Sequence, residues 1–199
     1  MALPKARSIE AENPGPVRPA KFAHVVLRTT DLKRARDWYL QFLDGRVGYE
    51  NEMVCFVTYD DEHHRVGLLA LPGLAPPVSG VAGLEHFAFT YASLGALLAN
   101  YRRLKRAGVM PFWCINHGPT LSLYYRDPDG NKIETQYDVF DTAEAATEFI
   151  HRHYGENFMG IIFDPDELAA RYEAGEPLGD LVRRPPLPAG KTPWDMHIP

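Results

Sequence analysis

The chain has 199 residues, of which 45% are hydrophobic and 24% charged, and this composition is typical of a folded globular protein rather than a disordered one. A formal net charge of −5 argues against a nucleic-acid or anionic-membrane binder, because such proteins carry a basic patch. No stretch approaches the roughly 20 apolar residues of a membrane span. We therefore expect a cytoplasmic protein that acts on small molecules and assembles as a homo-oligomer.

Cysteine and histidine usage points to different roles. Cys55 and Cys114 each lie in an apolar run, far apart in the sequence, so we expect buried thiols rather than a disulfide framework or a CxxC metal site. The eight histidines include the adjacent pair His63 and His64. Histidine is the commonest metal ligand, so these residues are the more informative.

The N-terminal half reads as an arm followed by one module. Prolines and alternating charges over 1–20 indicate an arm. The module, 22–71, is predicted to contain a strand, a helix capped by Asp31, and two strands joined by a polar turn that holds His63 and His64. The expected bounds are 22–27, 32–42, 53–59 and 65–71, with room for a further strand near 47–50.

The same order of elements returns in residues 83–139, after a Pro/Gly-rich bridge over 72–83. An offset of 62 residues places His24 over His86, Asp31 over Ser93 and Tyr39 over Tyr101. The later strands of this second module are expected at 112–114, 122–126 and 132–137. Residues 21–140 thus predict an α+β fold, in which two βαβββ modules curl into one open β-barrel around a metal site.

A C-terminal extension, 141–199, follows the two modules. It is predicted to hold a helix over 143–153 and a short helix with Asp164 as N-cap and Pro165 at its first position. The rest is a proline-rich, extended tail. Trp194 within the tail indicates docking on a surface.

Three residues are candidate metal ligands. His24 and His86 stand at equivalent positions at the heads of the two modules. Modules packed about a pseudo-twofold axis would bring the two imidazoles close together, and a shared cation is their obvious use. Glu134, in the last strand of the second module, is a candidate third ligand. Taken singly, each histidine fits an ordinary core position and the glutamate an exposed strand position.

The segment Tyr-Arg-Asp-Pro-Asp-Gly-Asn-Lys-Ile-Glu, together with a histidine at the head of each module, resembles the vicinal oxygen chelate superfamily of glyoxalases, fosfomycin resistance proteins and extradiol dioxygenases. The resemblance covers about 21–140. It implies that His24, His86 and Glu134 bind a metal, and this two-histidine, one-carboxylate set suits Fe(II) with open positions for substrate and oxygen.

The residues around the presumed ligands resemble one branch of that superfamily. Asp61-Glu62-His63-His64 is similar to a segment of type I extradiol dioxygenases whose second histidine is the acid/base, a role that falls on His64 here. His117 and Tyr124 precede the glutamate as a histidine and a tyrosine do in those enzymes. The resemblance therefore implies an Fe(II)-dependent, ring-cleaving dioxygenase, a one-domain member that acts on a catechol and dioxygen.

Other functions of the same fold remain open at this point. A glyoxalase I type enzyme would take a fourth ligand from the first module, but the same offset aligns Glu134 with Pro72 and finds no acid nearby. A fosfomycin-resistance type enzyme shares the ligand set but uses Mn²⁺ and would need more cationic groups. A metal-independent drug-binding protein would need no ligand set at all.

Overall fold

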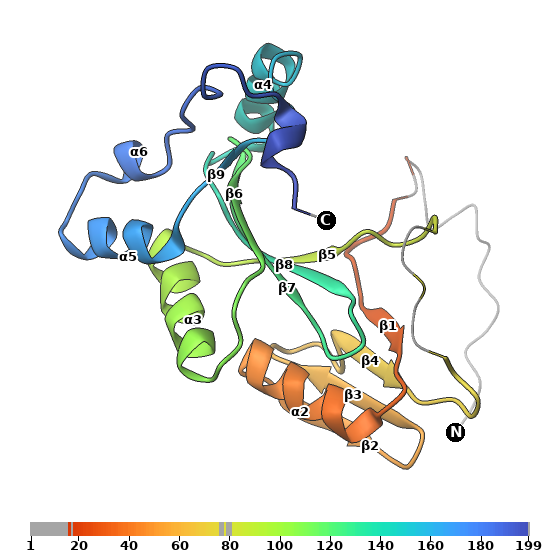
Figure 1. The fold of residues 1–199 in the computed structure, drawn as a ribbon. Helices are drawn as coiled ribbons and strands as arrows, with labels where there is room; N and C mark the ends of the chain where they lie inside the picture. Colours follow the sequence, from red (N-terminus) through yellow and green to blue (C-terminus); the bar gives the residue numbers. More distant parts are fainter. Residues whose placement is uncertain (1–15, 17, 76–77, 79–80, 199) are drawn as a thin grey trace.

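The computed structural model, which describes residues 16, 18–75, 78 and 81–198, has an α+β fold with two mixed sheets (Figure 1). The first half contains β1 (Val25–Arg28), α2 (Leu32–Leu43), β2 (Arg46–Glu50), β3 (Val54–Thr58) and β4 (Val66–Leu69). The second contains β5 (Phe87–Thr90), α3 (Leu94–Arg106), β6 (Trp113–Asn116), β7 (Thr120–Arg126) and β8 (Lys132–Asp138). Most of the expected N-terminal arm and part of the bridge lie outside the described residues.

The C-terminal extension adds five short elements. They are α4 (Ala143–His153), β9 (Ile161–Ile162), α5 (Pro165–Glu173), α6 (Leu178–Leu181) and the 3₁₀ helix η1 (Pro193–Met196). The capped helix at Asp164 is confirmed. The tail is not simply extended, because Thr192 and Asp195 form a capping box that starts η1. Among the described residues, no helix is both long and apolar enough to cross a membrane.

Strand order confirms the internal repeat. The first sheet has the order β1-β4-β3-β2 and the second β5-β8-β7-β6, with β9 added at its edge. In both sheets the first and last strands of the unit pair in parallel, and the other pairs are antiparallel. The backbone hydrogen bonds of the described residues form these two separate sheets, and a closed barrel is not seen.

The two long helices are equivalent, as predicted. The Asp31 side chain accepts from the backbone N–H of Arg34, and Ser93 in the same way caps α3. Tyr39 and Tyr101 each lie eight residues after the cap, and both are buried. Buried residues of both halves pack together in one hydrophobic core, and the equivalent residues Tyr39 and Tyr101 both belong to it.

A buried carboxylate joins the two halves. Asp127 lies in the turn between β7 and β8. Its carboxylate accepts one hydrogen bond from the Tyr39 hydroxyl at 2.9 Å and another from the backbone N–H of Asn131 at 2.8 Å. In the same turn, Asp129 accepts hydrogen bonds from the hydroxyls of Thr29 and Thr30. The turn of the second half is therefore fixed to the start of the helix in the first.

Replacing Tyr39 by Phe should lower the free energy of unfolding by about 1–3 kcal/mol, because Asp127 then loses a donor in a site away from water. Tyr59→Phe is the matched control, since the Tyr59 side chain is 44% exposed. We expect that control to stay within about 0.5 kcal/mol of wild type. Urea unfolding of the three proteins measures both values, and equal stabilities would show that this link contributes nothing.

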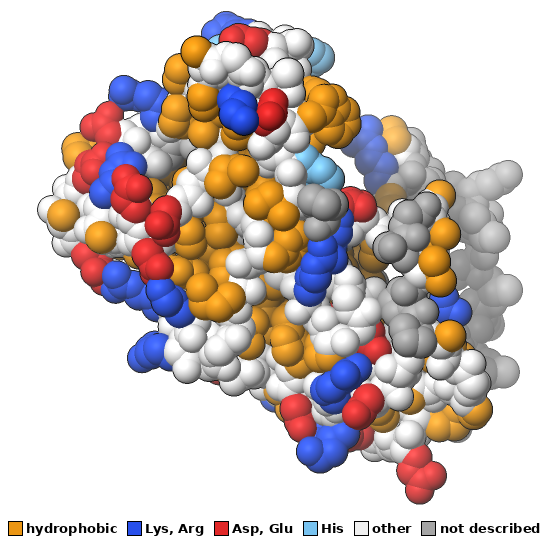
Figure 2. Space-filling model, viewed as in Figure 1, with side chains coloured by type: hydrophobic (Ala, Val, Ile, Leu, Met, Phe, Trp, Pro, Cys, Tyr) orange, Lys and Arg blue, Asp and Glu red, His pale blue; other side chains and the backbone are white. Residues whose placement is uncertain are grey.

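The extension packs on the far edge of the second sheet, where β6 and β9 lie (Figure 1). The Trp113 indole N–H donates to the carbonyl of Met196 at 2.9 Å, and the Asn116 amide donates to the carbonyl of Val182 at 2.9 Å. On the face drawn in Figure 2, hydrophobic side chains gather along the middle, with charges of both signs interspersed around them. The tail does dock, but through the buried Met196; Trp194, from which docking was expected, is 67% exposed, and its ring meets that of Phe158.

Candidate functional site

The register of the second sheet places the candidate residues in one row. Ala88, Glu134, Tyr124 and Trp113 stand directly opposite one another on successive neighbouring strands. Side chains paired in this way lie on the same face of a sheet. His86 precedes Ala88 by two residues, so it belongs to that face too. The helix α3 packs on the opposite face, with Leu123 and Ile133 in the shared core.

The equivalent row of the first sheet is apolar. It consists of Val26, Gly67, Phe56 and Tyr49. Gly67 therefore corresponds to Glu134, and the alignment of Glu134 with Pro72 at the constant offset was wrong. The offset drifts because the second unit has a longer helix and longer strands β7 and β8. The conclusion drawn from it survives, since a glycine provides no fourth ligand.

His86 and Glu134 form a close pair. His86 Nε2 lies 3.1 Å from Glu134 Oε2, and the carboxylate is almost completely buried while the imidazole is partly exposed. The carboxylate raises the pKa of His86. Burial acts to raise the pKa of Glu134, but hydrogen bonds from His86 and Ser122 outweigh it, so that this pKa is lowered. The structure thus holds an imidazole and a carboxylate, both of which are common metal-binding groups, in direct contact.

The three histidines of the first half, His24, His63 and His64, gather around the head of β1. The ring of His64 lies 4.1 Å from that of His24, 4.3 Å from that of His63 and 4.4 Å from that of Phe56, with which it is stacked. His64 is buried, and its Nδ1 has no hydrogen-bond partner among the described residues. His63 is exposed and binds Glu62 instead. Burial, helped by the two neighbouring imidazoles, lowers the pKa of His64.

His117 and Tyr124 are in contact beside Glu134. His117 Nε2 lies 3.0 Å from the Tyr124 hydroxyl, and His117 Nδ1 is hydrogen-bonded to the carbonyl of Met159. Burial lowers the pKa of His117, and burial with the nearby Glu134 raises that of Tyr124. Near neutral pH both groups are therefore uncharged, one able to accept a proton and the other to donate a hydrogen bond.

Several residues of this neighbourhood were not predicted as site residues. Ser122 bonds Glu134, Trp113 stacks on Tyr124 at 4.6 Å, and Met159 bonds His117. Strand alternation from Tyr124 could have found Ser122, because two residues apart on a strand means the same face. Met159 acts through its backbone carbonyl, which leaves no signal in the sequence.

The donor set suits a metal only in part as it stands. The nitrogen of His86 and the oxygen of Glu134 are ligands that Fe(II) accepts, and they share one face of the sheet. His24 contacts His64 rather than this pair. In the described part of the chain, no three His, Cys, Asp or Glu side chains are grouped closely enough to hold one ion. Two of the three predicted ligands, His86 and Glu134, are thus in contact, and the metal site itself stays a prediction.

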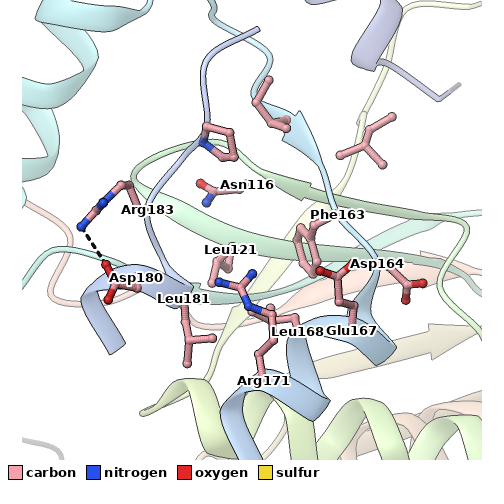
Figure 3. Close-up of a pocket in the computed structure, with 13 residues that line it drawn as sticks. Asn116, Leu121, Phe163, Asp164, Glu167, Leu168, Arg171, Asp180, Leu181 and Arg183 are labelled. Carbon is pink, nitrogen blue, oxygen red and sulfur yellow. Dashed lines mark hydrogen bonds and ion pairs between the residues drawn. The ribbon is translucent and has the colours of Figure 1, made fainter. Parts of the chain in front are cut away.

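A cavity of about 470 Å³ lies elsewhere, between the extension and the second sheet (Figure 3). Apolar side chains such as Leu121 and Leu168 line it together with charged ones, including the ion pair Asp180–Arg183. None of the candidate site residues lines it. The two cysteines are not candidates for a reactive role. Burial raises the pKa of Cys55 to about 11 and that of Cys114 to about 12, so both are thiols rather than thiolates near neutral pH.

Comparison with known proteins shows the family to which the chain belongs. The family model described as the Glyoxalase/Bleomycin resistance protein/Dioxygenase superfamily matches residues 21–135. Biphenyl-2,3-diol 1,2-dioxygenase 2 of Rhodococcus globerulus is 48% identical over 81% of this chain and 86% of its own length. Biphenyl-2,3-diol 1,2-dioxygenase 3 of the same organism is 43% identical over 82% and 88%, respectively.

A solved glyoxylase/bleomycin resistance protein/dioxygenase domain from Frankia sp. EAN1pec shares the fold, with a TM-score of 0.52 and 21% identity over 61% of this chain and 99% of that one. The match leaves more than a third of this chain uncovered. The family model spans both of the equivalent halves described above. The chain is a member of the glyoxalase/bleomycin resistance/dioxygenase superfamily.

Proposed function

We propose that the protein is an Fe(II)-dependent extradiol dioxygenase, which cleaves the ring of a catechol-type diol next to its two hydroxyl groups. The observation that carries the proposal is a pair of side-chain contacts on one face of the second sheet. His86 contacts Glu134, and His117 contacts Tyr124. Two relatives that are 48% and 43% identical to this chain over most of their length are named biphenyl-2,3-diol 1,2-dioxygenases. We therefore infer an aromatic vicinal diol and dioxygen as substrates.

His24, His86 and Glu134 would hold the iron. Iron held there would supply the Lewis-acid and redox chemistry needed to activate an aromatic diol and dioxygen. His86 and Glu134 contribute from adjacent strands, and Ser122 keeps the carboxylate in place. His24 would complete the set from the first sheet, if the two halves enclose the site as an open barrel built from modules 22–71 and 83–139.

His64 would move the proton. A diol binds to a metal more strongly as its anion, so a base must take a hydroxyl proton. The lowered pKa of His64 keeps its imidazole neutral near pH 7, and its Nδ1 is unoccupied among the described residues. His64 could later return the proton as an acid. Stacking against Phe56 holds the ring in place for both steps.

His117 and Tyr124 would bind the reacting oxygens. The Tyr124 hydroxyl is a donor beside Glu134, and hydrogen bonds aimed at developing negative charge are the most effective form of electrostatic stabilisation in enzymes. Phe112, Trp113 and Met196 surround Tyr124 with apolar surface, which excludes water from this side of the site. Such a wall also suits an aromatic substrate.

A diol panel tests the function. Protein loaded anaerobically with Fe(II) should consume one dioxygen per diol and give a yellow ring-opened product with at least one of catechol, its 3- and 4-substituted forms and 2,3-dihydroxybiphenyl. An oxygen electrode and absorbance spectra measure both. Tight binding of a hydrophobic drug without metal, and no turnover of any diol, would instead favour a binding protein of the same fold.

The remaining expectations belong with this proposal. We infer a cytoplasmic homo-oligomer, in which residues 21–140 form the catalytic modules and 141–199 an extension; the expected arm lies mostly outside the described residues. Exposed apolar residues on the first sheet, among them Val26 and Tyr49, leave surface for a second copy to cover. Light scattering at micromolar concentration tests the assembly, and a mass of one chain would contradict it.

A further inference from the structure

The turn that carries His117 is enclosed by the C-terminal extension. Gly118 has a φ of +101°, and a Cβ on it would lie 2.1 Å from the ring of Phe149 in α4. On the other side, Gly160 has a φ of +120°, and a Cβ there would lie 2.4 Å from the carbonyl oxygen of Asn116. Chain segments packed this closely leave His117 little room to move.

Two of the hydrogen bonds around this turn attach it to residues 182–184 of the extension. The Asn116 side chain, which lines the cavity of Figure 3, donates to the carbonyl of Val182. Two residues further on, Arg184 Nη1 donates at 2.9 Å to the carbonyl of His117 and at 2.9 Å to that of Asn157. One guanidinium group therefore bridges the backbone of the histidine and the loop opposite it, while it packs over the Phe149 ring.

That loop is rigid in its own right. The buried Asn157 side chain accepts from the backbone N–H groups of Met159 and Gly160, at 3.1 and 2.9 Å, and donates to the carbonyl of Gly160 at 2.9 Å. These bonds aim the Met159 carbonyl at His117 Nδ1. A carbonyl only accepts, so Nδ1 must carry the hydrogen. In the neutral ring, Nε2 is then the acceptor that faces the Tyr124 hydroxyl.

We propose that Arg184 is a positioning residue, which together with the Asn157–Gly160 loop holds His117 in the Nδ1–H tautomer with Nε2 directed at Tyr124. The proposal rests on the proposed function for its effect on catalysis, but the placement of His117 is independent of it. The extension then completes the active site, and the paired modules alone lack the group that orients one of its histidines.

Arg184→Met is the main test, because methionine keeps an apolar stem over Phe149 and donates no hydrogen bond. In metal-free wild-type protein, nitrogen NMR of the histidine side chains should show His117 with a protonated Nδ1 and an unprotonated Nε2. In Arg184→Met, His117 should be a mixture of the Nδ1–H and Nε2–H tautomers. In the iron-loaded variant, kcat should fall by about 10- to 100-fold, as happens when groups that support a metal site are lost, and KM should change less. Arg184→Lys, which keeps a cationic hydrogen-bond donor on a long side chain, should restore both readouts.

Arg183→Ala is the matched control, because Arg183 is exposed and its ion pair is with Asp180 on its own segment. It should leave the tautomer and kcat unchanged. The Trp113 indole N–H signal reports whether the tail stays docked through Met196. A single Nδ1–H tautomer retained in Arg184→Met would overturn the proposal, as would mixed tautomers in a docked Arg184→Lys. Absence of diol turnover by wild type would refute the proposed function but leave the NMR result decisive for the placement.

Discussion

Glu134→Gln should lower the affinity for Fe(II) by more than about 100-fold, since loss of a group that merely supports a metal ligand already costs 10- to 100-fold. The substitution keeps the size of the side chain and removes the negative charge. Glu134 is the only carboxylate in the row that faces His86, and it is buried, so no neighbouring acid of that row can take its place. Anaerobic equilibrium dialysis measures the affinity.

Glu85→Gln is the matched control for this change. Glu85 adjoins His86 in the sequence, but its side chain is exposed and pairs with Lys132. We expect its Fe(II) affinity to match wild type. If Glu134→Gln also binds one equivalent of iron as tightly as wild type, Glu134 is not a ligand, and His24→Ala would then show whether the first half contributes to any metal site.

His64→Ala should lower turnover by about 10²- to 10⁴-fold, the usual contribution of a positioned acid/base, while iron binding is unchanged. The imidazole is buried between His24 and Phe56 and is therefore held in one place. Its pKa is lowered by burial, so the base form persists below the ordinary value of 6.5. The acidic limb of the kcat/KM profile should accordingly lie below pH 6.5 in wild type and be absent in the variant.

His63→Ala serves as the control for His64. The His63 side chain is 70% exposed and bonded to Glu62, so its removal should change turnover by less than a few-fold. The same adjacent pair thus offers one buried and one exposed imidazole in nearly the same place. Full activity in His64→Ala with a large loss in His63→Ala would assign the acid/base role to His63. If neither variant loses activity, His117 would be the remaining candidate for that role.

The local elements were predictable because their signals are local. Asp31 and Ser93 cap their helices, and apolar residues at helical spacing placed Tyr39 and Tyr101 in the core. The repeat could be read from the same residues. Pro165 after Asp164 likewise marked the start of α5. In each case a side chain acts on backbone within one turn of itself, and the sequence then suffices.

The parts that escaped prediction depend on contacts between distant segments. Strand β9 has two residues, too few for any periodicity, and it forms because Ile161 and Ile162 meet the free edge of β6. The Met159 carbonyl and Arg184 reach His117 from more than 40 residues away. The position in the first sheet that is equivalent to Glu134 was predicted wrongly, because helix and strand lengths differ between the halves. A constant offset therefore failed at the last strand.

The most direct test of the central claim is the fate of dioxygen with 2,3-dihydroxybiphenyl as substrate. Iron-loaded protein under isotopically heavy dioxygen should give a ring-opened product that contains both heavy atoms, with cleavage beside the diol rather than between its two carbons. Mass spectrometry of the product establishes both points. A product with both heavy atoms and the bond beside the diol broken is the result we predict; an intact ring, or cleavage between the two hydroxylated carbons, would contradict the account.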